Sequence, residues 1–278
     1  MKLQYLGTAA AEAVPAPFCE CEVCEHARER GGRNIRTRSQ ALIDDRLLID
    51  FPGDTYLHTL REKFKLCDID ACIITHPHSD HLYPQELFCR TACAAHMKTE
   101  KPFRMYGTKP VLSALRNGTG TTGELEAEGR LILTEIRPFE PFRIMGYTIT
   151  ALKADHSTPE PVVYLIENDD GCAMLYCHDT GLLPEETMAY LRRISTQVSL
   201  VSYDCTNGLL EWDNRGHMGV AGAVQTRESL REMNRITDKT LHVLNHFSHN
   251  GLAGYDELSP IAEQKGFIVS YDGMTVYF

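Results

Sequence analysis

The chain has 278 residues, of which 43% are hydrophobic and 24% charged, a composition typical of a globular protein with a sizeable core. No apolar run reaches the roughly 18–20 residues of a membrane span, and the first residues lack the apolar stretch of a signal peptide. We therefore expect a cytoplasmic protein without membrane contacts. The formal net charge of −10 disfavours nonspecific binding to nucleic acid, whereas a bound metal pair would still attract a small anionic substrate.

Short runs rich in Val, Ile, Leu, Tyr and Phe, many of them bounded by Asp, Gly or Pro, predict β-strands along the whole chain. They are 2–7, 41–51, 71–75, 103–107, 131–136, 147–154, 161–167, 172–177, 198–204, 241–245, 266–270 and 274–278. Asp44 and Asp45 interrupt the second run and indicate a tight hairpin.

Helical patterns lie between these runs. They cover 21–30, 55–64, 84–96, 110–116, 184–193, 219–233 and 255–265. Pro184 followed by two glutamates is typical of a helix start, because proline fits the first turn and acids favour the positive end of the helix dipole. The polar, glycine-rich segment 117–130 predicts an exposed loop. This order of elements indicates an α/β fold in which two sheets carry helices on their outer faces, formed as a single domain over 1–278.

The motif His76-Pro77-His78-Ser79-Asp80-His81 follows the predicted strand 71–75 directly. On an extended chain His76 and His78 point the same way, because strand side chains alternate, and Asp80 and His81 follow at the turn. Imidazole and carboxylate ligands together suit zinc, manganese or iron. The motif therefore predicts a metal site where a strand ends, and a merely polar loop is the weaker interpretation.

Further candidate ligands also come just after predicted strands. They are Asp155 and His156, His178 and Asp179, and His246. A single histidine in such a place is more often an ordinary loop residue than a ligand. The repeated placement at strand ends, alongside the first motif, favours a dinuclear site.

Together these motifs resemble the metallo-β-lactamase superfamily, from the opening strand to the closing segment 270–278. The resemblance implies a four-layer αββα sandwich with the metal site at one edge of the two sheets. It also implies a division of the ligands. His76, His78 and His156 would hold one metal, Asp80, His81 and His246 the other, and Asp179 would bridge the two.

Three closely spaced thiols stand near the start of the chain. The segment FCECEVCE contains Cys19, Cys21 and Cys24. Zinc in a structural site takes four ligands, and His249 is the favoured fourth, with His26 as the alternative. Such a closed Cys₃His site would tie this N-terminal excursion to the loop that carries His246. We expect the remaining cysteines to be reduced, small and mostly buried hydrophobic residues. These are Cys67, Cys72, Cys89, Cys93, Cys172, Cys177 and Cys205.

The combination CECEVC, HPHSDH, DTGLLP and NHFSH resembles the PhnP-like phosphodiesterases more specifically. This resemblance implies hydrolysis of a small cyclic phosphodiester, such as 5-phosphoribosyl 1,2-cyclic phosphate or a 2′,3′-cyclic nucleotide, by a hydroxide that bridges two metals. It implies manganese or zinc, with iron as a further option, in the active site, one structural zinc and a homodimer. His217, which would contact the phosphate as a general acid, and Asp80 are the candidate catalytic residues. An alternative for His217 is a residue at a helix start that bonds its own backbone.

Some roles stay open at this stage. Asp155 is a candidate for orienting a ligand imidazole. Arg33, Arg36, Arg38 and Ser39 are a possible source of contacts to a second phosphate, although a solvated basic loop is the favoured interpretation. His58, His96 and His242 match no family position and are interpreted as ordinary core or surface residues.

Three other functions compete with the cyclic phosphodiesterase. An RNase Z-like or single-strand nuclease would need a basic, aromatic docking surface, which the net charge and the single tryptophan, Trp212, disfavour. Thioester or lactone hydrolases of this fold lack the cysteine cluster. A noncatalytic metal-binding scaffold would be expected to have lost ligands, and this chain keeps them.

Overall fold

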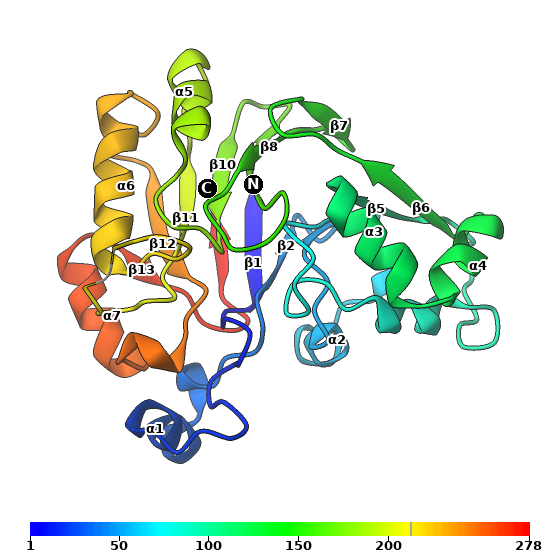
Figure 1. Ribbon diagram of the computed structural model, residues 1–278, viewed down its shortest axis with the longest axis horizontal. Helices are drawn as coiled ribbons and strands as arrows, with labels where there is room; N and C mark the ends of the chain where they lie inside the picture. The colour runs from blue at the N-terminus through cyan, green and yellow to red at the C-terminus, as the bar shows by residue number, and fades with distance from the viewer. Residues whose placement is uncertain (212) are drawn as a thin grey trace.

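Two seven-stranded mixed sheets form the centre of the computed structural model (Figure 1), which describes residues 1–211 and 213–278. Trp212 lies outside the described residues. The first sheet has the order β14 (Thr275–Tyr277), β1 (Lys2–Gly7), β2 (Gln40–Ile43), β3 (Leu47–Ile49), β4 (Ala71–Ile73), β5 (Phe103–Gly107) and β6 (Leu131–Glu135). The second has the order β13 (Ile268–Val269), β12 (Leu241–Asn245), β11 (Leu200–Asp204), β10 (Ala173–Cys177), β9 (Val162–Asn168), β8 (Tyr147–Lys153) and β7 (Phe142–Ile144).

Helices cover the outer face of each sheet, which completes the predicted four-layer αββα sandwich (Figure 1). The helices are α1 (Glu22–Arg30), α2 (Thr55–Glu62), α3 (Lys109–Gly118), α4 (Thr121–Ala127), α5 (Glu185–Arg193), α6 (Val220–Glu232) and α7 (Tyr255–Gln264). Short 3₁₀ turns are η1 (Gly32–Asn34), η2 (Leu66–Asp68), η3 (Pro84–Arg90) and η4 (His249–Gly251). Among the described residues, none of these helices has both the length and the apolar character that crossing a bilayer requires.

Three apolar layers hold the sandwich together. The central layer lies between the sheets and takes side chains from both, for example Leu3 and Ile43 from the first and Tyr164 from the second. The outer layers pack the sheets against the helices. Strand β2 is buried on both faces, since Ile43 points into the central layer and Leu42 into an outer one. This double burial explains why such strands appear in the sequence as continuous apolar runs rather than alternating ones.

The hairpin prediction at Asp44 and Asp45 is confirmed. Ile43 pairs with Leu47 across the turn, and both aspartates have positive φ angles, of 46° and 59°. Short polar side chains tolerate this left-handed backbone better than bulky ones do. The predicted start of α5 at Pro184 is confirmed as well, because Pro184 is the residue that caps this helix.

The loop prediction for 117–130 is wrong, because this segment contains helix α4. One apolar side chain decides the conformation: Leu125 is fully buried in the outer layer of the first sheet. Thr122 adds a hydrogen bond from its hydroxyl to the Leu115 carbonyl, at 2.7 Å. The helix predicted over 84–96 is also shorter than expected, since only the 3₁₀ turn η3 forms.

The burial predicted for the scattered cysteines is partly wrong. Cys72, Cys177 and Cys205 are buried, but three others are exposed and one is half-buried. The exposed ones are Cys67, Cys89 and Cys93, and the half-buried one is Cys172. Cys89 lies in the 3₁₀ turn η3, which buries Leu87 instead of the thiol.

The two sheets meet at the end where many strands have their carboxyl ends. The Val162 N–H of the second sheet donates to the Thr75 carbonyl after β4, at 3.1 Å. Nearby, Phe247 after β12 pairs with Ala9 after β1. Because the loops that leave these strands emerge at one edge, their side chains are brought together there.

Candidate metal centre

The predicted ligands lie on loops that leave β4, β8, β10 and β12 at this shared edge. His76 and the rest of its motif follow β4, and His156 follows β8. Asp179 and His246 follow β10 and β12 with left-handed φ angles of 51° and 63°. This sparsely populated conformation turns the chain sharply after each strand, and such residues cluster at functional sites.

One group of side chains contains His76, His78, His156 and Asp179, whose donor atoms all lie within 4.8 Å of one another. His78 Nδ1 is 3.1 Å from both His76 Nε2 and His156 Nε2. The Asp179 Oδ2 atom is 3.2 Å from His76 Nε2. The structure therefore brings together the residues predicted for the first metal.

A second group contains Asp80, His81, Asp179 and His246. The Nε2 atoms of His81 and His246 are 3.2 Å apart. Asp179 Oδ2 is 2.8 Å from His81 Nε2, and Asp80 Oδ2 is 3.3 Å from the same atom. Asp179 belongs to both groups, as a bridging ligand would.

The outward-facing nitrogens of the histidines are held by oxygen atoms. His81 Nδ1 is 2.7 Å from Asp50 Oδ2, and His246 Nδ1 is 2.8 Å from Thr206 Oγ1. His76 Nδ1 is 3.0 Å from Thr75 Oγ1. Such partners fix the tautomer of an imidazole and aim its other nitrogen at a metal.

The remaining contacts inside the cluster fit a divalent cation. Imidazole nitrogens face one another at about hydrogen-bond distance, and the buried Asp179 Oδ1 accepts no hydrogen bond from the described residues. His217 Nδ1 and His246 Nδ1 approach this oxygen only to 3.3 and 3.4 Å, without hydrogen-bond alignment. A cation would satisfy these nitrogen and oxygen atoms together, and the mixed imidazole–carboxylate set suits zinc, manganese or iron.

His217 stands beside both groups but belongs to neither of the predicted ligand sets. It lies in the loop between β11 and α6, with its Nδ1 3.4 Å from Asp204 Oδ2. The ring centre is 5.0 Å from that of His156, and the side chain is 31% exposed. The alternative of a residue bonding its own backbone is wrong, since Nδ1 faces two carboxylates.

The cysteine cluster also assembles. Cys19, Cys21, Cys24 and His249 bring their donor atoms within 4.8 Å of one another. His249 Nδ1 is 3.5 Å from Cys19 Sγ and 3.4 Å from Cys21 Sγ. His26 instead pairs with Glu257 at 2.8 Å, so the alternative fourth ligand is ruled out. Three sulfurs and one imidazole are a typical donor set for a structural zinc.

Residues 46–246 match the family model of the β-lactamase superfamily domain. The chain belongs to the metallo-β-lactamase superfamily. Together with the His/Asp groups, this membership makes it a metal-dependent hydrolase. No curated protein sequence matches it significantly.

Solved structures of this superfamily share the fold over the full chain. A diphosphatase of the PhnP family has a TM-score of 0.73 at 20% identity and covers 100% of this chain and 97% of its own. Zinc-bound PqqB from Methylobacterium extorquens has a TM-score of 0.78 at 19% identity and covers 100% of both. The short form of human tRNase Z has a TM-score of 0.65 at 16% identity, with 100% and 99% covered. These likenesses confirm the fold and place PhnP-like proteins among its structural relatives.

Burial and close charges shape the protonation of this superfamily site. Burial raises the pKa of Asp179, but the charges of the nearby imidazolium groups outweigh burial. The pKa of Asp179 therefore lies well below its usual range. For His81, burial lowers the pKa, but the charges of Asp50, Asp80 and Asp179 raise it well above the ordinary value. Burial and the charge of His81 together lower the pKa of His76 to about 4. At neutral pH and without metal, His76 is thus neutral and Asp179 ionised, whereas His81 carries a proton that a bound metal ion would displace.

The pKa of His217, like that of His81, is raised by carboxylates. Burial lowers its pKa, but the hydrogen bond and charge of Asp204 outweigh burial and raise the pKa to about 9. Asp204 is fully buried and also accepts from the backbone N–H groups of Met218 (2.9 Å), Asp179 (3.0 Å) and Thr206 (3.1 Å). One carboxylate thus fixes both a predicted ligand and the candidate acid.

Two of these functional residues were missed in the sequence, namely Asp50 and Asp204. Each stands at the end of a buried strand, in LLID and VSYD, which is the same placement that revealed the ligands. A lone aspartate there looks like an ordinary turn residue. These two aspartates are distinguished by being fully buried without an ion pair to a lysine or arginine of the described residues. This property is visible only in the fold.

Several other candidates have roles outside the metal groups. His178 is buried, with Nε2 2.7 Å from Ser202 Oγ, and joins neither group. Asp155 does not contact a ligand imidazole as expected, because its Oδ2 accepts the N–H of Gly216 at 3.0 Å. His58 and His242 are buried and His96 is exposed, in line with the ordinary roles expected.

The basic segment that holds Arg33, Arg36, Arg38 and Ser39 is a solvated loop only in part, because Arg33 is exposed whereas Arg36 and Ser39 are buried. Arg36 is buried, donates to Thr8 Oγ1 at 2.9 Å, and lies 4.0 Å from the ring centre of Phe247. Arg38 pairs with Asp54 at 3.2 Å. Arg36 and Arg38 therefore stabilise the fold through these contacts. The contacts give no support to a role of the two arginines in binding a second phosphate.

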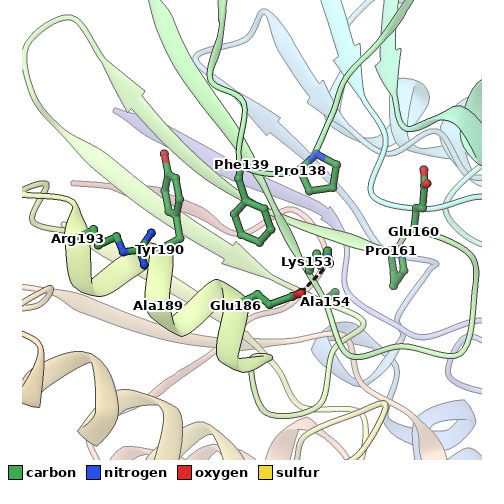
Figure 2. A pocket seen from close by; sticks show the side chains of 10 residues that line it. All are labelled: Pro138, Phe139, Lys153, Ala154, Glu160, Pro161, Glu186, Ala189, Tyr190 and Arg193. Carbon is green, nitrogen blue, oxygen red and sulfur yellow. Dashed lines mark ion pairs between the residues drawn. The ribbon is translucent and has the colours of Figure 1, made fainter.

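A surface cavity of about 950 Å³ lies next to the His156 loop (Figure 2). Its lining includes Lys153 and Glu160, which flank that loop in sequence, and the aromatic pair Phe139 and Tyr190. Lys153 is paired with Glu186 at 2.6 Å. None of the residues in the metal groups lines this cavity. We therefore place the candidate catalytic site at the strand ends and not in this cavity.

Proposed function

We propose that this chain is a dinuclear-metal phosphodiesterase that hydrolyses a small cyclic phosphodiester. The observation that carries the proposal is one arrangement: two ligand groups share Asp179, and the imidazole of His217, which is in neither predicted ligand set, has its donor atom within 4.8 Å of those of Asp179, Asp204 and His246. A site of this kind offers two cations and a separate proton donor. These are the parts that a phosphodiester needs, because charge develops both on the phosphoryl oxygens and on the leaving oxygen.

The ligands of the two ions follow from the groups. His76, His78 and His156 would hold one ion and Asp80, His81 and His246 the other, with Asp179 between them. When bound, two divalent ions lower the pKa of coordinated water and neutralise charge on phosphoryl oxygens. Manganese, zinc and iron all suit this donor set. A zinc on the cysteine cluster would be structural, since all four positions are filled by protein.

Proton transfer is the task we assign to His217. Asp204 faces Nδ1 and holds the ring, which leaves Nε2 for the leaving oxygen of the substrate. The partial exposure of the side chain lets a substrate reach it. Asp80 is buried and packed against His81, so we assign it to the ligand group and leave the proton donor role to His217 alone.

A small substrate fits the surroundings better than a polymer. His76, Asp80, His81, Asp179 and His246 are all buried, so access is from the side of the partly exposed His78, His156 and His217. Arg36 is engaged inside the fold, Arg38 pairs with Asp54, and Arg33 is exposed but lies over the rings of Tyr255 and Tyr271. The net charge is −10. Both features disfavour a surface that tracks a nucleic-acid backbone. The motif combination CECEVC, HPHSDH, DTGLLP and NHFSH, which resembles the PhnP-like phosphodiesterases, supports 5-phosphoribosyl 1,2-cyclic phosphate or a 2′,3′-cyclic nucleotide as the substrate.

Phosphorus NMR tests the proposal. Manganese-loaded protein is incubated with 5-phosphoribosyl 1,2-cyclic phosphate, 2′,3′-cyclic AMP or a short single-stranded RNA, the enzyme is removed, and the spectra are recorded. We expect one cyclic ester to open to a single phosphomonoester with wild-type protein and not with His78→Ala. Cleavage of RNA alone would favour the nuclease, and no reaction of any ester by protein shown to hold metal would refute the proposal.

A further inference from the structure

Two consecutive residues hold Gly216 by both of its backbone groups. The Gly216 N–H donates to Asp155 Oδ2 at 3.0 Å. The Gly216 carbonyl lies 3.3 Å from His156 Nδ1. Gly216 has a φ of 74°, a left-handed conformation that favours glycine. Apart from its two chain neighbours, no described residue has an atom within 4 Å of where a Cβ would stand. The residue is therefore a backbone connector between the loop after β8 and His217, its next neighbour.

A third loop meets the same point. The Gly181 N–H donates to the Asp155 carbonyl at 2.9 Å, and the Leu182 N–H donates to the Asn214 carbonyl at 2.9 Å. A Cβ on Gly181 would stand 2.2 Å from Asn214 O and 2.5 Å from Asp155 Oδ2. The loops after β8, β10 and β11 are thus in direct contact, and only a glycine at 181 lets them approach this closely.

The backbone around His217 is fixed on both sides. On the following side, the Met218 N–H donates to Asp204 Oδ1 at 2.9 Å. On the preceding side, the contact of the Gly216 N–H with Asp155 plays the equivalent role. Among the described residues, Asp155 has no hydrogen bond or ion pair with a ligand imidazole. Arg215, which precedes Gly216, is paired with Asp213 at 2.5 Å. The carboxylate of Asp155 is directed at the His217 loop.

We propose that Asp155 is a positioning residue that sets the place of His217 through the Gly216 N–H. The inference rests on the proposed function, because it assigns the device that aims the proton donor of that same site. Removing the carboxylate releases the Gly216 N–H on the preceding side of His217, while Asp204 still holds the Met218 N–H on the following side. The imidazole is then present but displaced, and a displacement of about 1 Å can cost on the order of a hundredfold in rate.

The leaving group separates this role from a general structural one. An alkoxide needs a proton as it departs, whereas p-nitrophenolate departs without one. Loss of Asp155 should therefore slow the opening of 2′,3′-cyclic AMP strongly and the hydrolysis of bis(p-nitrophenyl) phosphate little. A weakened metal site would slow both substrates alike.

The experiment compares wild-type enzyme with four variants, all loaded with manganese. They are Asp155→Ala, Asp155→Asn, His217→Ala and the Asp155→Ala/His217→Ala double variant. For Asp155→Ala we expect kcat on 2′,3′-cyclic AMP to fall at least about tenfold, with KM and bound manganese unchanged. On bis(p-nitrophenyl) phosphate kcat should stay within about threefold. Asp155→Asn keeps an acceptor oxygen for the Gly216 N–H and should restore most of the rate. The double variant should match His217→Ala, because residues that act through one step are not additive.

Equal losses on both substrates, a loss of manganese in Asp155→Ala, or an additive double variant would overturn the proposal. A second readout needs no turnover: hydrogen exchange of peptides covering 213–218, measured by mass spectrometry on the loaded enzyme. Asp155→Ala should accelerate exchange in this segment and leave 240–246 unchanged, and identical exchange in wild type and variant would overturn the proposal. If wild-type protein opens no phosphodiester, the proposed function fails, and the exchange data still decide whether Asp155 holds the His217 loop.

Discussion

Replacing Asp50 with asparagine should weaken one metal site and spare the other. Asp50 is fully buried and accepts from the Thr75 N–H at 2.8 Å, from the Thr75 hydroxyl at 2.9 Å, and faces His81 Nδ1 at 2.7 Å. An asparagine oxygen can still serve Thr75. The amide NH₂ then meets the Nδ1–H of His81, so either the two donors repel or the ring adopts the tautomer that points a proton at the metal.

The size of the effect follows from the contact that is lost. A hydrogen bond to a charged group contributes about 1.5–3 kcal/mol. Since 1.4 kcal/mol corresponds to tenfold in a binding constant, the second metal should bind roughly 10- to 150-fold more weakly. This agrees with the roughly 10- to 100-fold losses found when the partner of a ligating histidine is removed.

Competition against a fluorescent chelator measures both manganese affinities. We expect Asp50→Asn to lower one of them and to leave the other within about threefold. Asp70→Asn is a matched control, because Asp70 is also an ion-paired aspartate but pairs with Arg46 and Lys101 at 2.8 Å near the surface. Wild-type affinity at both sites of Asp50→Asn, or an equal loss at both, would refute the reasoning.

Three further predictions concern the zinc cluster, a buried histidine and the contact between loops. Cys24→Ser should lower the zinc content by about one ion per chain and lower the urea midpoint of unfolding, without changing manganese binding, and metal analysis with urea titration checks this. His58 is buried, and burial lowers its pKa to about 4. Because the folded pKa lies below the unfolded one, its stabilising effect is complete above pH 6.5 and is lost as the pH falls toward 4, by up to about 3 kcal/mol. His58→Gln should therefore show a smaller loss of unfolding free energy between pH 7.5 and 4.5 than wild type, and equal losses would contradict the assignment. Gly181→Ala would place a Cβ 2.2 Å from Asn214 O, so we expect a destabilisation of about 1–3 kcal/mol in urea unfolding, and an unchanged midpoint would count against the close packing of these loops.

Much of the metal centre could be predicted because its residues share a simple rule of placement. His76, His156, Asp179 and His246 each follow a predicted strand, and parallel strand ends meet at one edge. The fold could be predicted as well, because its buried strands appear in the sequence as recognisable runs of apolar residues. The cysteine cluster followed from its tight spacing and the limited choice of a fourth ligand.

The rest depends on packing between distant segments. Asp204 acts through contacts with Asp179, Thr206 and Met218, which come together only when β10, β11 and the loop before α6 are in place. Asp155 depends in the same way on the close approach at Gly181. Helix α4 escaped prediction because its fully buried apolar side chain, Leu125, stands in a glycine-rich segment. Local sequence cannot show which side of such a short segment meets the core.

Anomalous X-ray diffraction from crystals of protein loaded with manganese and zinc tests the central claim most directly. The account predicts two manganese peaks, one among His76, His78 and His156 and one among Asp80, His81 and His246, with Asp179 contacting both. It predicts a separate zinc peak at the cysteine cluster. A single peak or none among the histidines, in crystals whose cysteine cluster is filled, would contradict a two-metal hydrolytic site.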